Sequence, residues 1–179
     1  TNLHEVLLEQ NLLTILDAST FKGLSRLRTI DLSYNTIGSV TYDAFQGLVN
    51  LKYLYLDHNV IRELPPGIFE DLVSLHRVDL NNNKIQSLPD NLFQKTNIIT
   101  DIRLNNNEIR IISSTAFSHN LTYLQRLNLS SNVFSQWTIP EGGFPSLLIL
   151  SMVNVEQMYQ APDPIQCGCP GVQQLEFTY

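Results

Sequence analysis

The most regular feature of the chain is a pattern of hydrophobic and polar positions that repeats about every 24 residues. Aliphatic residues recur eight, five and three positions before a repeated asparagine, and another apolar residue follows two positions after it. A phenylalanine stands ten residues after each of the first five asparagines. A fixed period of this length indicates a stack of similar units rather than a single closed core. The repeated asparagines are Asn11, Asn35, Asn59, Asn83, Asn107 and Asn132.

Apolar and polar residues alternate over a few positions before each asparagine, and this alternation predicts a short strand with one buried face. In the third unit, Leu54 is expected to point inward between the outward-facing Tyr53 and Tyr55. Strands of successive units then form one parallel sheet, and a column of buried asparagines donates to and accepts from the turns beside the strands. The phenylalanines are expected to fill the opposite side of each coil, with rings that can pack edge to face.

The pattern changes towards the end of the chain. The sixth unit delays its phenylalanine to Phe144, which indicates a two-residue insertion within 138–143. A seventh unit without an asparagine follows, so the repeats are predicted to occupy residues 1–158. These irregular units fit either a ladder that tapers towards a cap or a lateral binding site. The aliphatic and asparagine positions expected for the seventh unit are Leu150, Val153, Val155 and Met158.

The unit reads L-x-x-L-x-L-x-x-N-x-Φ, where Φ is apolar, and it resembles the leucine-rich repeat. Its length and its phenylalanine column resemble the typical 24-residue repeats of extracellular proteins, namely Toll-type receptor ectodomains, Slit-like proteins and variable lymphocyte receptors. The resemblance implies a leucine-rich repeat solenoid, a right-handed superhelix with a curved parallel β-sheet on its concave side. Short 3-10 or irregular segments are expected on the convex side, because stretches such as 65–68 and 87–90 contain Pro or Gly and are too short for more than a turn of helix.

Both ends of the chain are expected to be cut from a longer protein. The repeats begin directly at the N-terminus, with neither a signal peptide nor a cysteine-flanked cap. Residues 163–169 resemble the P-x-x-C-x-C opening of a cysteine-rich cap, which implies that residues 159–179 begin an incomplete C-terminal cap. In such caps, cysteines like Cys167 and Cys169 each pair with a partner further along, and this chain ends before one appears. The residues that fit the apolar face of a first cap helix are Val172, Leu175 and Phe177.

Two N-glycosylation sequons occur, Asn120-Leu121-Thr122 and Asn128-Leu129-Ser130. The first falls on a convex loop, and the second is expected to face outward on a strand. Together with the cap resemblance, they favour an extracellular or cell-surface glycoprotein with disulfide bonds.

Composition narrows the classes of function. The net charge of -6 and the pI near 5.1 disfavour a protein that neutralises phosphates, so no nucleic-acid partner is predicted. No stretch approaches the ~18 apolar residues of a membrane span, so membrane attachment is expected only through segments outside this chain. The Asp79-x-Asn81-x-Asn83 segment mimics a calcium loop, but Lys84 occupies the position that requires Gly. No metal site, cofactor or enzymatic activity is predicted.

The outward positions of the strands are the expected binding face, because they form one continuous concave surface in a solenoid. Tyrosine and arginine, which are enriched at binding hot spots, occur among them. Arg77 neighbours Asp101 across two strands, and Asp79 neighbours Arg103 in the same way. These charges either satisfy one another or contact a ligand. The predicted ligand-binding residues are Asp31, Tyr34, Tyr53, Tyr55, Asp57, His58, Arg77, Asp79, Asp101 and Arg103.

These features favour a non-catalytic protein-recognition module. The resemblance implies a segment of a secreted or cell-surface receptor of Toll-like kind, with a role in innate immune or developmental signalling. The expected partner is a protein ligand or a co-receptor, with a homodimer or heterodimer as a possible assembly. The alternative is a structural or adhesive role, as in extracellular-matrix leucine-rich repeat proteins. The sequence does not identify the ligand.

Overall fold

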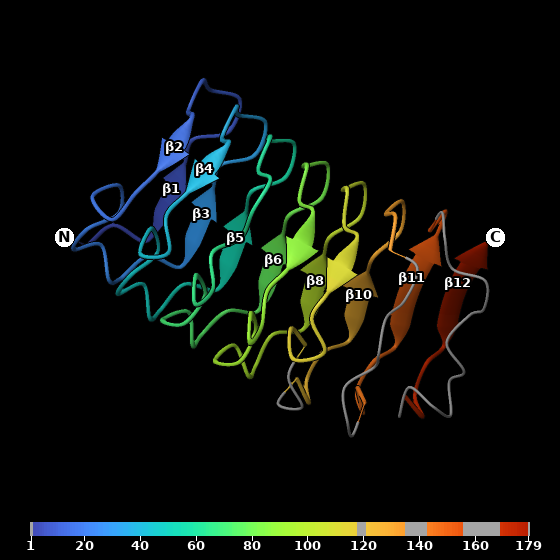
Figure 1. Cartoon of the computed structure of the whole chain (residues 1–179). Helices are drawn as coiled ribbons and strands as arrows, with labels where there is room; N and C mark the ends of the chain where they lie inside the picture. The colour runs from blue at the N-terminus through green and yellow to red at the C-terminus, as the bar shows by residue number, and fades with distance from the viewer. Residues whose placement is uncertain (1, 118–120, 135–142, 156–168, 179) are drawn as a thin grey trace.

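The computed structural model describes residues 2–117, 121–134, 143–155 and 169–178. They form a stack of coils whose longer strands join one eight-stranded parallel sheet, with the strands in chain order. Figure 1 shows the coils following one another from the N-terminus to the C-terminus in a curved array. The strands of this sheet are β1 (Glu5–Leu7), β3 (Thr29–Asp31), β5 (Tyr53–Tyr55), β6 (Arg77–Asp79), β8 (Asp101–Arg103), β10 (Arg126–Asn128), β11 (Ile149–Val153) and β12 (Gln174–Thr178).

Two small parallel sheets join neighbouring coils away from the main sheet. One pairs β2 (Ile15–Leu16) with β4 (Ser39–Val40), and the other pairs β7 (Ser87–Leu88) with β9 (Ile111–Ile112). Turns, bends and irregular segments make up the remaining backbone, and no helix occurs in the described ranges. Within those ranges, therefore, no helix is long and apolar enough to cross a membrane. This arrangement confirms the predicted solenoid with a curved parallel sheet.

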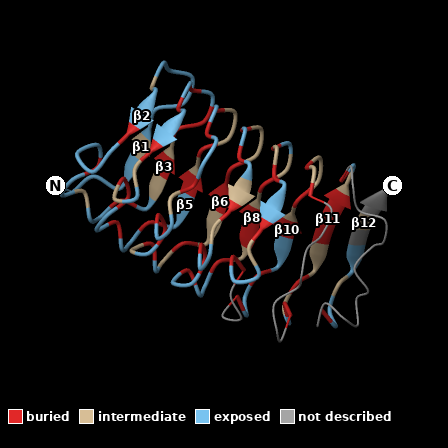
Figure 2. Ribbon diagram, viewed as in Figure 1, coloured by how far each residue is buried: buried red, intermediate tan, exposed pale blue. Residues whose placement is uncertain are grey.

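The strand register explains why the same apolar column is buried in every coil. Leu54 lies opposite Ile30 on one neighbouring strand and opposite Val78 on the other. All three side chains are fully buried, so each aliphatic residue covers the next one along the stack. Burying a side chain of this size stabilises the fold by about 1.5–3 kcal/mol. Figure 2 shows buried segments recurring from coil to coil, with exposed residues frequent in the bends.

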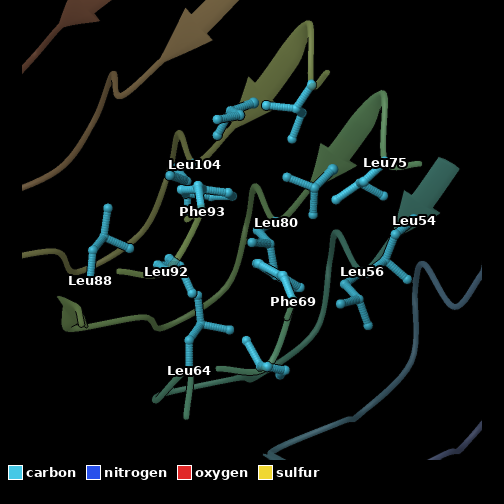
Figure 3. Packing of buried hydrophobic residues seen from close by; sticks show 14 of the residues in the cluster. Leu54, Leu56, Leu64, Phe69, Leu75, Leu80, Leu88, Leu92, Phe93 and Leu104 are labelled. Carbon is cyan, nitrogen blue, oxygen red and sulfur yellow. The ribbon is translucent and has the colours of Figure 1, made fainter. Parts of the chain in front are cut away.

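A column of phenylalanine rings fills the interior behind the sheet (Figure 3). Phe93 lies between Phe69 and Phe117, with ring centroids 5.7 Å and 5.6 Å apart and interplanar angles of 26° and 11°. These rings are stacked, whereas edge-to-face packing was expected, because identical coils repeat the same ring orientation. Phe144 comes later in its unit, and its ring meets Phe117 at 83°. The edge-to-face expectation therefore holds only where the repeat is irregular.

Asn59 illustrates the hydrogen bonds that link each coil to the one before it. Its Nδ2 donates to the Leu32 carbonyl of the preceding coil at 2.9 Å and to the Leu56 carbonyl of its own coil at 3.0 Å. Its Oδ1 accepts from the Ile37 N–H at 2.9 Å. Asn11, in the first coil, is exposed and donates to carbonyls of its own coil. The pattern of Asn59 recurs at Asn35, Asn83, Asn107 and Asn132.

In the seventh coil, the residues that occupy the repeat positions are not the ones predicted. Leu150 lies opposite Leu127 in the sheet, so the next inward residue is Met152, which is fully buried. Val155, also buried, then takes the position that asparagine holds in the other coils. The prediction that placed Met158 there was wrong by three residues, because the aliphatic residues of this segment fit two frames. Met158 itself lies outside the described residues.

The last strand corrects a second expectation. Leu175 lies opposite Leu150 in the sheet, so residues 174–178 extend the parallel sheet as β12 and do not form the predicted cap helix. Cys169, just before this strand, is buried and disulfide-bonded, so the expectation that its partner lies beyond the end of this chain was wrong. Cys167 lies outside the described residues. The division into repeats over residues 1–158 and a cap over residues 159–179 stays a prediction.

Candidate functional site

The concave side of the main sheet gathers the outward-pointing residues into rows. Alternate residues of a strand point to the same face, so each three-residue strand presents its first and third side chains. The first row runs across neighbouring strands as Thr29, Tyr53, Arg77 and Asp101. The second row runs in the same order as Asp31, Tyr55, Asp79 and Arg103.

Four charges on β6 and β8 form one cluster at the centre of this face. The Arg77 guanidinium donates to Asp79 at 2.9 Å and lies 3.8 Å from Asp101. The Arg103 guanidinium lies 3.3 Å from Asp101 and 3.8 Å from Asp79. The cross-strand neighbours predicted from the sequence are therefore present, but the shorter contacts join residues two apart on the same strand. The cluster holds two positive and two negative charges.

Asp79 is the most deeply placed member of the cluster, with 4% of its surface exposed. Its Oδ1 and the Nε of Arg77 are buried without a hydrogen-bond partner. Burial raises the pKa of the Asp79 carboxyl above 3.8, and the neighbouring Asp57 adds to the rise, while hydrogen bonding to Arg77 opposes it. The cluster is thus balanced in charge but incompletely satisfied in hydrogen bonds.

Tyrosine and histidine rings lie beside the cluster on earlier coils. The Arg77 guanidinium carbon lies 5.3 Å from the centre of the Tyr55 ring, within the range of a cation–π contact. Tyr34 stacks on His58, with ring centroids 4.1 Å apart and an interplanar angle of 10°. His58 Nδ1 lies 2.9 Å from an oxygen of Asp57. Aromatic and acidic groups therefore alternate along one side of the concave face.

The stack of Tyr34 on His58 depends on a backbone feature that sequence reasoning missed. Both residues precede a ladder asparagine and adopt left-handed φ values of 55° and 54°. The sequence did contain a signal for this feature, because the residue before each repeated asparagine falls at a tight bend in every coil. The other residues with positive φ at this position are Gln10, Asn82, Asn106, Ser131 and Asn154.

Charge is divided between the two edges of the concave face. Asp31 accepts from the N–H and the hydroxyl of Ser33, and it lies with Asp57 towards the ends of the strands. Basic side chains line the opposite edge, where the strands begin. These basic residues are His4, Arg28, Lys52 and His76, and His76 is the most covered of them.

All ten predicted ligand-binding residues lie on or beside the strands from β3 to β8, so the structure brings them together on one surface. The predicted glycosylation site Asn128 lies on β10, and its Oδ1 accepts from the Ser130 N–H at 3.0 Å. Asn120 lies outside the described residues. Among the residues that the structure describes, no group of three His, Cys, Asp or Glu side chains is arranged to hold a metal ion.

The solved structures most informative for this chain are two receptor complexes. The Drosophila Toll–Spatzle complex matches 99% of this chain at 25% identity with a TM-score of 0.88. The TLR13–ssRNA13 complex matches 97% at 24% identity with a TM-score of 0.68. This chain spans 23% of the first matched chain and 28% of the second. No curated protein matches.

Family models give the same assignment from the sequence. The model described as leucine rich repeat matches residues 1–61 and 73–134, and a model of two such copies matches residues 49–93. The matched ranges cover most of the repeats defined by the asparagine column. The expected resemblance to Toll-type ectodomains is confirmed, and the chain belongs to the leucine-rich repeat family.

Proposed function

We propose that this chain is a non-catalytic segment of an extracellular or cell-surface receptor, and that its concave sheet binds a protein ligand. The observation that carries this proposal is the gathering of exposed tyrosines beside charged residues on one preformed surface. Tyr34 and Tyr53 are 52% and 40% exposed, and tyrosine is enriched at binding hot spots. The likeness to Toll in complex with Spatzle supports a protein as the ligand and a role in development or innate immunity.

The rigidity of the face supports binding without large rearrangement. Each strand is tied to its neighbours by the sheet, and ladder residues such as Asn59 fix the turn that follows. A preformed surface loses little conformational entropy when a partner docks. The chain therefore acts as a docking surface, alone or in a dimer or co-receptor assembly, and needs no cofactor for that task.

The charge distribution favours protein over nucleic acid. TLR13 is found with single-stranded RNA, so RNA is the natural competing ligand. Asp31 and Asp57 give the concave face around β3 and β5 a negative character, which repels phosphates. The basic residues Arg28 and Lys52 are confined to the strand-start edge. RNA binding is therefore not part of the proposal.

A second role, structural or adhesive, is favoured by one observation. Val49, Val73, Ile98 and Tyr123 each stand three or four residues before a strand of the main sheet, and all four are exposed. Exposed apolar side chains at similar places in successive coils promote association between copies. Light scattering over a range of concentrations separates the roles, because an adhesive array forms assemblies that keep growing with concentration, whereas a ligand-binding segment stops at a monomer or a dimer.

The test of the proposed function compares two pairs of tyrosines. Tyr53→Ala with Tyr55→Ala alters the concave face, whereas Tyr42→Ala with Tyr123→Ala removes exposed rings elsewhere. Binding to purified Spatzle and to a short single-stranded RNA is measured by biolayer interferometry. We expect the concave pair to weaken Spatzle binding at least about tenfold, as for hot-spot tyrosines, and the other pair to change it little. Equal losses from both pairs, or a preference for RNA, would overturn the proposal.

A further inference from the structure

Three acidic residues neighbour Tyr55 on the concave face. Asp31 and Asp79 lie directly opposite Tyr55 on the two neighbouring strands. Asp57 follows Tyr55 by two residues and therefore points to the same face. Neighbouring strands lie about 4.8 Å apart, so Asp31 and Asp79 flank Tyr55 across the sheet, and Asp57 follows it along the chain.

The positive charges nearby compensate only part of this negative charge. Arg77 and Arg103 lie within 4.0 Å of Asp79, and both are shared with Asp101. Among the described residues, no lysine or arginine forms an ion pair with Asp31 or with Asp57, and the basic group nearest to Asp57 is the His58 ring, whose Nδ1 lies 2.9 Å from an Asp57 oxygen. Asp31 instead accepts hydrogen bonds from Ser33 within its own turn. A cation supplied from outside the chain has two carboxylates to pair with.

A separate observation identifies a missing hydrogen-bond donor at the same place. The Asp79 side chain is 6% exposed, and its Oδ1 has no hydrogen-bond partner. A buried oxygen left in this way costs about 1–3 kcal/mol, more for a charged group. It lies in the same row as Tyr55, at the base of the acidic cluster. The exposed Tyr53 ring, on the same strand as Tyr55, borders the cluster towards the strand start.

The arrangement already accommodates one guanidinium. Arg77 lies over the Tyr55 ring at 5.3 Å while it donates to Asp79. Arginine is suited to these surroundings, because its planar guanidinium stacks on aromatic rings and donates two parallel hydrogen bonds to a carboxylate. The remaining carboxylates belong to Asp31 and Asp57, which are neighbours of Tyr55 across the sheet and along the chain.

We propose that the acidic cluster of Asp31, Tyr55 and Asp57 binds an arginine or lysine side chain of the protein ligand. The ligand's cation pairs with the two carboxylates beside the tyrosine rings, and Asp79 adds negative potential at the base. This proposal rests on the proposed function and names the chemistry of the partner's contact. We therefore expect a basic segment of the protein ligand to lie over this part of the sheet.

The test uses a defined probe with a neutral counterpart. The probe is the blocked peptide Gly-Arg-Gly-Arg-Gly, and its counterpart carries citrulline in place of arginine, which keeps the shape and removes the charge. NMR titration of the whole chain is expected to show an affinity for the arginine peptide at least about tenfold higher, with shifts at Asp31, Tyr55 and Asp57. Equal affinity for both peptides would overturn the proposal.

Two double variants separate a specific site from general attraction to an acidic chain. Asp31→Asn with Asp57→Asn is expected to lower the affinity for the arginine peptide at least about tenfold. Glu63→Gln with Glu70→Gln removes the same amount of charge from exposed residues outside the sheet and is expected to change it less than about twofold. Equal losses from both variants would mean that the peptide follows net charge alone, and the proposal would fail.

Spatzle binding by the same variants distinguishes the proposed cation contact from the proposed function, which is protein binding by the concave sheet. If the Tyr53→Ala and Tyr55→Ala pair abolishes protein binding and the Asp31→Asn and Asp57→Asn pair leaves it unchanged, the concave face binds a protein without a cation at this cluster. That outcome overturns the present proposal and leaves the proposed function standing. Loss of protein binding in both pairs supports both.

Discussion

The two sides of the main sheet differ although they are built from adjacent residues of the same three-residue strands. On the inner side, Ile30, Leu54 and Val78 are chemically alike and fully buried. On the concave side, the neighbours Tyr53 and Arg77 differ in size and in charge. An inward residue must fit between identical residues above and below, whereas an outward residue has only its cross-strand neighbours to satisfy. The inner side therefore sets the shape, and the concave side is left to set recognition.

The largest expected loss of stability comes from a substitution in the buried core behind the sheet. Phe93→Ala removes a fully buried ring that stacks on two others, and we expect the free energy of unfolding to fall by about 3–5 kcal/mol. Urea unfolding followed by circular dichroism measures it. The matched concave variant, Tyr53→Ala, removes a ring that is 40% exposed and should cost about 1 kcal/mol or less. Similar losses in the two variants would contradict the division between the sides.

The next effect concerns the asparagine column. Asn83→Ala removes the donors to the Leu56 and Leu80 carbonyls and the acceptor for the Ile61 N–H. Leaving buried groups unpaired costs about 1–3 kcal/mol, so we expect a loss near the upper end of that range. Asn81→Ala, two residues earlier on the solvated face, is the control and should be nearly neutral. Equal stability of the two variants in urea would show that the ladder does not hold the coils together.

The inner side was predictable from the sequence because its constraint repeats. Six asparagines and the aliphatic residues before them share one period, and the solenoid follows from that period. The frame of the seventh coil was not predictable in the same way. Val155 occupies the asparagine position there, so the anchor of the pattern is missing and the apolar residues around Leu150 and Met152 fit two frames.

The concave side was predictable only in part. Alternation along the strands places residues such as Tyr55 and Asp79 on the same face, and the structure brings them together. Alternation does not specify which partner a flexible side chain chooses, and Arg77 contacts Asp79 on its own strand more closely than Asp101 on the next one. The ring stack of Tyr34 and His58 also depends on left-handed φ values that apolar periodicity does not report.

A smaller effect is the pH dependence of stability that arises from two carboxyls on opposite sides of the coils. Burial raises the pKa of Asp79, so the folded chain takes up this proton more readily than the unfolded chain. Stability from this group therefore increases as the pH falls from 7 through its folded pKa towards 3.8. Asp79→Asn removes that dependence. Urea unfolding from pH 7 to pH 4 should show the stability of the wild type rising relative to this variant as the pH falls, and the reverse trend would contradict the burial of Asp79.

Asp90, on the convex side, is the control of opposite sign. Hydrogen bonds from Ser113 and Thr115 lower the pKa of Asp90. Its contribution to stability is present above 3.8 and is lost as the pH falls through its folded pKa. The wild type should therefore lose stability relative to Asp90→Asn below pH 3.8, whereas it gains relative to Asp79→Asn between pH 7 and pH 4.

The smallest effect lies at the edge of the concave face, where the stack of Tyr34 on His58 is partly exposed to solvent. A double-mutant cycle with Tyr34→Ala and His58→Ala should give a coupling of about 0.5 kcal/mol, the lower end for aromatic pairs. Tyr53 and His76 are the comparison pair, with centroids 6.4 Å apart and a tilt of 44°, and their coupling should be weaker still. If both couplings are small, the aromatic rings of the concave side contribute little to the fold. That result would be consistent with the proposed contact with a partner, and a coupling above about 2 kcal/mol would instead assign the rings to stability.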